Sequence, residues 1–138
     1  MRRSRVLIGI AVAVSIIAAL AVVRFIATRR AQTVREVSYR AAVESYAERF
    51  GAGVSRADVE RQLRDRGVEF HQVGGLEERT AYADLVKIGE EAVPWFCSEH
   101  NVYVALHFAA PDDSHPSDAR PSDVLKRVTL FKRLEGCL

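Results

Sequence analysis

The chain opens with a long apolar block that has no polar face. Residues 6–23 carry no charge, Ser15 is their only polar side chain, and arginines flank them on both sides. At ~1.5 Å of rise per residue, the block spans about 27 Å, close to the ~30 Å hydrocarbon core of a bilayer. A helix packed in a soluble core normally keeps one polar face. We therefore predict a membrane anchor over residues 1–30, with a transmembrane helix over about 6–27.

A cleaved secretion signal is the alternative for this block, because Ala19-Leu20-Ala21 matches a small-x-small cleavage pattern. The block stays apolar beyond that site, whereas the apolar part of a signal peptide usually runs about 7–15 residues. We therefore favour an uncleaved signal-anchor. The arginines before the block favour an N-terminus inside the cell, although those after it argue the other way. The prediction is a single-pass protein whose domain lies outside the cytoplasm, on the periplasmic or extracellular side.

Two helical patterns follow the apolar block. Aromatic and apolar residues fall at i, i+4, i+7 and i+11: Tyr39, Val43, Tyr46 and Phe50. This spacing predicts a helix over 31–50 with one apolar stripe. The stripe packs in a core or, alternatively, forms a groove for a partner helix. Ser55 and Asp58 resemble a capping box before a short amphipathic helix over 56–66. Its arginines alternate with acidic residues, which is typical of a solvated, self-paired face.

The second half of the chain has strand patterns. We predict a loop over 68–80 and strands at the following positions: 83–89, 92–98, 101–108 and 124–138. The strand over 101–108 is the clearest, because apolar residues alternate along it. A run rich in Pro, Asp and Ser over 110–123 predicts a loop.

The last two predicted strands can be aligned as a hairpin around the 110–123 loop. When paired residue numbers sum to about 234, Val104 faces Leu130 and Leu106 faces Val128. Apolar residues then meet across the strands, which is the condition that a register must satisfy. The same register places Cys97 opposite Cys137 if the strand runs unbroken through 98–101.

The two cysteines therefore have two interpretations. A Cys97–Cys137 disulfide suits the hairpin register and an exported domain. If residues 98–101 form a turn instead, Cys97 lies on a neighbouring strand and the two thiols stay separate.

Charge is distributed unevenly along the chain. Residues 1–30 hold six arginines and no acidic residue, whereas residues 31–138 hold 14 Lys and Arg against 18 Asp and Glu, a net charge of −4. The basic character therefore belongs to the N-terminal segment. A mildly acidic domain lacks the positive stripe that phosphate binding needs, so we expect no nucleic-acid partner.

Patterns that carry catalysis are missing from the sequence. It has no glycine-rich phosphate loop with a following Lys, no G-x-S-x-G frame, and no pair of histidines at helical i, i+4 spacing. Cys97 has His100 nearby, but nothing supplies the third group that normally orients the base. We therefore predict a non-enzymatic protein without a cofactor or metal.

One face of the predicted sheet gathers residues suited to binding. Tyr103 and His107 alternate with the core residues of their strand, and the hairpin register sets Phe131 opposite Tyr103. With Trp95, these residues form a candidate interaction face; packing in a sheet edge or core is the simpler explanation for Trp95.

The order of elements and one motif resemble the SmpA/OmlA family, the BamE-type outer-membrane assembly lipoproteins. Residues 53–63, GVSRADVERQL, are similar to that family's G-x-[ST]-x-x-x-V-x-x-x-L helix opening, and an apolar strand and a closing strand follow in the same order. The chain departs from the family in having no lipobox cysteine and no Gly-x-Pro after the small helix. The resemblance implies an α+β fold and a protein-binding role at the envelope, and it assigns no functional residue.

Together these patterns predict an α+β domain over residues 31–138, with two helices packed on a three- to four-stranded antiparallel sheet behind a membrane anchor. The predicted function is a membrane-anchored, non-enzymatic module for protein interaction or envelope maintenance, with the bilayer and an unidentified protein as partners. The alternative is a domain that binds a small ligand, or assists an enzyme, through the second sheet face.

Overall fold

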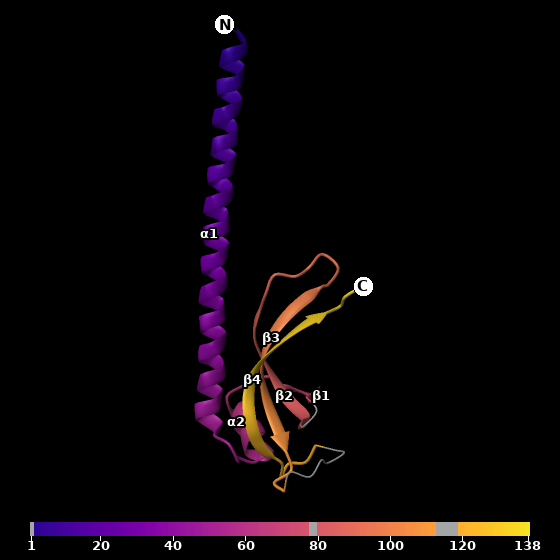
Figure 1. Ribbon diagram of the computed structural model, residues 1–138. Helices are drawn as coiled ribbons and strands as arrows, with labels where there is room; N and C mark the ends of the chain where they lie inside the picture. The colour runs from indigo at the N-terminus through magenta and orange to yellow at the C-terminus, as the bar shows by residue number, and fades with distance from the viewer. Residues whose placement is uncertain (1, 78–79, 113–118) are drawn as a thin grey trace. The chain divides into compact units, whose positions relative to one another are not determined.

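The computed structural model describes residues 2–77, 80–112 and 119–138, which form helices followed by a sheet (Figure 1). The elements are α1 (Arg2–Phe50), α2 (Arg56–Asp65), β1 (His71–Glu77), β2 (Thr80–Glu90), β3 (Glu99–Ala109) and β4 (Val124–Glu135). The strands form one antiparallel sheet in the order β1-β2-β3-β4. The α+β class and the antiparallel sheet therefore agree with the sequence-based prediction.

The predicted membrane span is not supported. In the part of the chain that the structure describes, no helix combines the length and the apolar character needed to cross a bilayer. The structure does not describe the side chains of residues 6–13. The uncharged run that it does describe begins at Val14 and ends before Arg24, and Arg29 and Arg30 follow. This finding contradicts the transmembrane helix over 6–27 and, with it, the signal-anchor and single-pass localisation.

The chain divides into two compact units between Ser38 and Tyr39, within helix α1. In the first unit, Met1–Ser38, the described side chains from Val14 onward are exposed. The second unit, Tyr39–Leu138, contains the sheet, α2 and the last turns of α1. All packing described below lies within this second unit.

The core of the second unit lies between the helices and one face of the sheet. The helices contribute Phe50, Val59 and Leu63, and the strands contribute Val104, Leu106 and Phe108 together with Tyr82, Val86 and Leu125. Tyr39 and Phe50 are buried, and Val43 and Tyr46 are partly buried, which confirms the predicted aromatic stripe as core packing. Removal of this apolar surface from water is the main driving force for the fold.

Helix α2 begins where its sequence predicts. Ser55 has extended backbone angles, and its Oγ accepts a hydrogen bond from the Asp58 N–H at 3.2 Å. This bond satisfies one of the orphan N–H groups of the first turn. The helix ends at Asp65, and Gly67 follows with a φ of 67°, a left-handed conformation that glycine adopts without a Cβ penalty.

The predicted hairpin register is confirmed. Strands β3 and β4 pair Tyr103 with Phe131, Val104 with Leu130 and Leu106 with Val128, and the same register continues to Glu99 and Glu135. It shifts by one residue only after His107, at a bulge. Strand β3 therefore runs unbroken from Glu99 through Asn101, and the alternative of a turn at these residues is wrong.

Two predicted segments differ from the structure. Residues 92–98 form no strand, because Pro94 opens a turn in which the Cys97 N–H donates to the Pro94 carbonyl at 3.0 Å. The predicted loop over 68–80 contains strand β1, which pairs only with β2. An edge strand tolerates the exposed polar residues and the glycine, Gly74, that suggested a loop. The centre of the predicted 110–123 loop lies outside the described residues.

Candidate functional site

The most exposed large aromatic side chain of the second unit lies in the loop between β2 and β3. We call residues 91–98 the Trp95 loop. Trp95 is 91% exposed at the tip of the turn that begins at Pro94, and its ring meets the Phe96 ring edge-on at 5.8 Å. An indole this exposed contributes little to the core, and Val93 and Phe96 of the same loop are exposed as well; exposed apolar side chains that lie together are typical of interaction sites.

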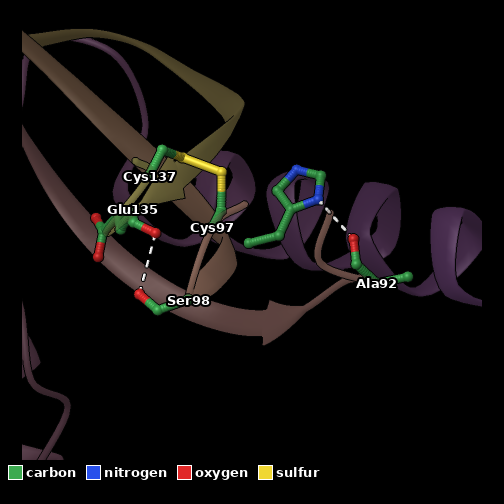
Figure 2. Close-up of a disulfide and its surroundings, with 6 residues drawn as sticks. Ala92, Cys97, Ser98, Glu135 and Cys137 are labelled. Atoms are coloured by element: carbon green, nitrogen blue, oxygen red, sulfur yellow. Dashed lines mark hydrogen bonds between the residues drawn. A yellow bond between two sulfur atoms is a disulfide. The ribbon is translucent and has the colours of Figure 1, made fainter. Parts of the chain in front are cut away.

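A disulfide holds the base of this loop. Cys97 and Cys137 are joined with an S–S distance of 2.05 Å and a Cα–Cα distance of 3.9 Å, and the bridge closes a separation of 40 residues (Figure 2). These two residues continue the β3–β4 register beyond its last pair, Glu99 with Glu135. The bridge therefore ties the loop to the segment that follows β4.

Backbone contacts at the same place depend on a glycine. The Ser98 N–H and Oγ both donate to the Glu135 carbonyl at 3.1 Å (Figure 2). Gly136 follows with a φ of 59°, and a Cβ at this position would overlap the Ser98 Oγ. Gly136 thus serves two needs, because it adopts a left-handed backbone and leaves room for Ser98 beside the bridge.

Further contacts order the loop from both sides. The Leu138 N–H donates to the Phe96 carbonyl at 2.9 Å, and the His100 Nδ1 lies 3.3 Å from the Ala92 carbonyl oxygen. Glu91 forms an ion pair with Lys132 at 2.6 Å. Apolar side chains that are exposed at this end of the hairpin form what we call the apolar tip: Val93, Trp95, Phe96 and Leu134.

A polar network lies beneath the disulfide. Asn101 is 2% exposed, and its Nδ2 donates to the Glu99 Oε2 at 2.6 Å and to the Glu135 Oε2 at 3.2 Å. Its Oδ1 is buried without a partner among the described residues. The amide is oriented by the two carboxylates, because the reverse orientation would set an oxygen against both. Asn101 therefore bridges two acidic residues that face each other across the hairpin.

Tyr103 extends this network toward the second sheet face. Its hydroxyl lies 3.4 Å from the Glu135 Oε1, and the ring is 3% exposed. Burial raises the pKa of the Tyr103 hydroxyl, and the nearby Glu135 carboxylate raises it further. Tyr103 therefore stays a neutral hydrogen-bond donor and offers no nucleophile or base near neutral pH.

The sequence-predicted interaction face is only partly assembled. Tyr103 and Phe131 pack with ring centroids 6.4 Å apart, and His71 meets Tyr103 edge-on at 5.4 Å. His107 is 2% exposed, its Nε2 lies 2.8 Å from the Thr129 Oγ1, and burial lowers its pKa. Trp95 lies apart from this face on its own loop.

A buried ion pair was missed by sequence analysis. Arg56, the first residue of α2, is 8% exposed, and its Nη2 lies 2.9 Å from Asp84 Oδ1 on β2 and 2.8 Å from Gln72 Oε1 on β1. The guanidinium also lies 4.8 Å from the centre of the Tyr82 ring. Burial raises the pKa of Asp84, and the hydrogen bond from Arg56 opposes this effect. The signal available in the sequence was a single acidic residue inside the apolar run 83–89.

Arg56 and Asp84 already have hydrogen-bond partners within the protein, so we interpret the pair as a connection between α2 and the sheet. Within the described residues, no group of three or more His, Cys, Asp or Glu side chains could hold a metal ion. Both cysteines of the chain are in the disulfide and are not available as thiol nucleophiles. The disulfide-closed end, with its exposed indole, is therefore the candidate functional site.

No family model, curated protein or solved structure matched this chain. The resemblance to the SmpA/OmlA family consequently remains a prediction from the motif at residues 53–63.

Proposed function

We propose that this protein is a non-enzymatic interaction module that docks a partner protein through Trp95. The observation that carries the proposal is the 91% exposure of this side chain at the tip of a loop closed by a disulfide. Tryptophan is enriched among the few residues that dominate binding energy at protein interfaces. Its ring offers a large contact area, and its N–H can find a partner.

The construction of the loop supports the same function. A turn, a disulfide and hydrogen bonds to the end of β4 restrict the backbone on both sides of Trp95. A binding group that is already ordered loses less conformational entropy on association.

The shape of the apolar tip indicates the kind of partner. Trp95 is 91% exposed on a turn, so a concave apolar pocket on the partner would be complementary to it. Glu91 and Lys132, on the loop and on β4, form an ion pair with each other. We therefore propose a protein partner with an apolar pocket and a polar rim, which is the usual composition of such interfaces.

Site-specific photo-cross-linking tests this proposal in the full chain. A photoreactive residue at Ala92, which is exposed beside the turn, would form an adduct with the partner, whereas one at Glu44, exposed on α1, would not. The Trp95→Ala exchange should weaken binding of the partner so identified by about 30- to 1,000-fold, as for an interface hot spot. The Trp95→Phe variant should bind the partner more weakly than the unchanged protein and more tightly than Trp95→Ala.

Binding of the purified partner by calorimetry then gives the dissociation constants. If Trp95→Ala binds as tightly as the unchanged protein and its circular dichroism spectrum is unaltered, docking through Trp95 is ruled out. An adduct formed equally from Ala92 and Glu44 would also contradict the proposal, because it would show contact without a defined site.

A further inference from the structure

We infer that the Cys97–Cys137 disulfide is a redox control on the presentation of Trp95, so that reduction releases the Trp95 loop while the helix-covered core stays folded. This inference rests on the proposed function, because it concerns the same loop. Three observations carry it: the bridge is accessible, the contacts that would remain are weak, and two like charges face each other directly beside it.

The bridge is accessible to a thiol. Cys137 is exposed and Cys97 is half-buried, so attack on the Cys137 Sγ is not blocked by the core. Exposed disulfides are the ones that take part in regulation, whereas purely structural bridges resist reduction. The reductant that fits this geometry is a dithiol, either a small molecule or a protein with two neighbouring cysteines.

The exchange is balanced as two substitutions at sulfur. A thiolate of the dithiol attacks the Cys137 Sγ, an S–S bond forms between them, and Cys97 leaves as a thiolate that takes up a proton. The second thiol of the reductant then loses its proton and attacks the reductant's other sulfur, which is bonded to Cys137 in this mixed disulfide. This releases Cys137 as a thiolate, which is protonated. Two electrons pass to the protein, and the dithiol becomes a disulfide.

Little holds the loop once the bridge is open. The remaining connections to β4 are the two bonds from Ser98 to the Glu135 carbonyl, the bond from the Leu138 N–H to Phe96 and the partly exposed Glu91–Lys132 ion pair. Ser98, Phe96 and Leu138 are exposed, so water competes for each of these bonds. The ladder between β3 and β4 starts only at Glu99, beyond the loop.

Electrostatics favour opening at this end. Glu99 and Glu135 form the outermost pair of the β3–β4 ladder, where like charges placed directly opposite destabilise pairing. The neutral Asn101 amide donates to both carboxylates, and the exposed Arg133 Nε, 3.6 Å from the Glu135 Oε1, offsets only part of the repulsion because water screens an exposed pair. The disulfide therefore lies next to a strand pair that carries like charges.

The effect of reduction should stay local. The nearest members of the helix-covered core on β3 are Val104, Leu106 and Phe108, which lie well inside the ladder. Their burial depends on Phe50, Val59 and Leu63 of the helices and not on the bridge. A loop that opens while the core persists is what a control element needs.

Trp95 is the single tryptophan of the chain and reports directly on the loop. We expect the fluorescence anisotropy of the full chain to fall when a dithiol reduces the bridge, because the indole gains nanosecond motion. Hydrogen exchange at the Ser98 and Leu138 amides should quicken by about tenfold, the equivalent of one hydrogen bond. Exchange at Leu106 should remain far slower than at Ser98 in the reduced protein, as expected for a core that stays folded. Thiol labelling and mass measurement count the opened cysteines in each sample.

The double variant Cys97→Ser, Cys137→Ser is the matched control. Its anisotropy should equal that of the reduced protein and should not respond to the dithiol. If thiol labelling shows that both cysteines are reduced and the anisotropy is still unchanged, the inference is overturned. It is also overturned if the dithiol opens the bridge only under conditions in which the Leu106 amide exchanges too. If cross-linked adducts with the partner depend on Trp95 in both the oxidised and the reduced protein, the proposed function stands and redox control of it is ruled out. A fall in anisotropy without any Trp95-dependent adduct would contradict the proposed function alone.

Discussion

The β3–β4 hairpin has two ends that are built in different ways. At one end, Leu106 and Phe108 of β3 lie beneath α1 and α2, and van der Waals packing holds the strands. At the other end, the strands carry Glu99 and Glu135, and a covalent bridge and a few exposed hydrogen bonds hold them. Figure 1 shows the Trp95 loop and the C-terminus together at this second end.

The difference separates stability from function. The helix-covered end buries its aromatic rings, whereas the disulfide-closed end exposes one. A loop that keeps an indole in water cannot rely on burial for its order, so it requires a cross-link. Substitutions at the two ends should therefore have effects that differ in size and in kind.

The largest loss of stability is expected at the helix-covered end. Phe108→Ala would leave a cavity among Tyr82, Leu125 and the helices, and such substitutions typically cost about 3–5 kcal/mol. Urea unfolding followed by circular dichroism measures the change in unfolding free energy. If the cost were below about 1 kcal/mol, the size of a typical surface effect, this end could not be the main source of stability.

A smaller loss is expected from Gly136→Ala at the disulfide-closed end. The left-handed backbone costs about 1–2 kcal/mol for alanine, and overlap with Ser98 adds to it. Gly51→Ala is the matched control, because its φ is 60° and a Cβ there meets nothing within 4 Å. Equal losses for the two variants would show that the approach of Ser98 to Gly136 does not constrain this end.

Acid should weaken the fold through His107. Its pKa in the folded protein is lowered from 6.5 by burial, so the unfolded chain takes up the proton first as pH falls. The free energy of unfolding should therefore be greatest above pH 6.5 and decline as pH falls below it, until the folded-state pKa is passed. Urea unfolding between about pH 8 and pH 5 measures this decline, and His107→Gln should reduce its slope. An unaltered slope in that variant would assign the decline to other groups.

The smallest effect on stability is expected from Trp95→Ala. The side chain is almost fully exposed, and surface substitutions usually change the unfolding free energy by less than about 0.5 kcal/mol. Thermal unfolding of Trp95→Ala and Phe108→Ala under the same conditions compares the loss of stability at the two ends directly. A loss above about 2 kcal/mol would mean that the indole packs against the protein in solution and is not held ready for a partner.

Sequence patterns predicted the local features of this fold well. The alternation along 101–108 and the apolar positions of the last strand were enough to predict the register that pairs Val104 with Leu130. The Ser55 cap and the glycine that ends α2 were also predicted, because caps depend on neighbours within one turn. Strand β1 was missed, since an exposed edge strand lacks the apolar alternation that indicates a strand.

The candidate site was only partly predictable. The hairpin register pointed to a Cys97–Cys137 bridge, but a separate prediction placed Trp95 on a strand over 92–98, in one interaction face with Tyr103 and His107. The turn at Pro94 removes Trp95 from the sheet, and the two sheet residues are buried. Hydropathy likewise predicted a membrane span over 6–27, which is contradicted because no helix among the described residues is long and apolar enough to cross a bilayer.

What the sequence alone determined is the set of features governed by neighbours along the chain: helical stripes, the Ser55 cap and the pairing register of β3 with β4. Only the tertiary structure decided which side chains are buried and which are exposed. Arg56 lies inside because Asp84 and Gln72, far away in sequence, meet it there. Trp95 lies outside because a bridge to Cys137 holds its loop at the end of the sheet. Burial depends on contacts between distant segments, which a pattern along one segment does not contain.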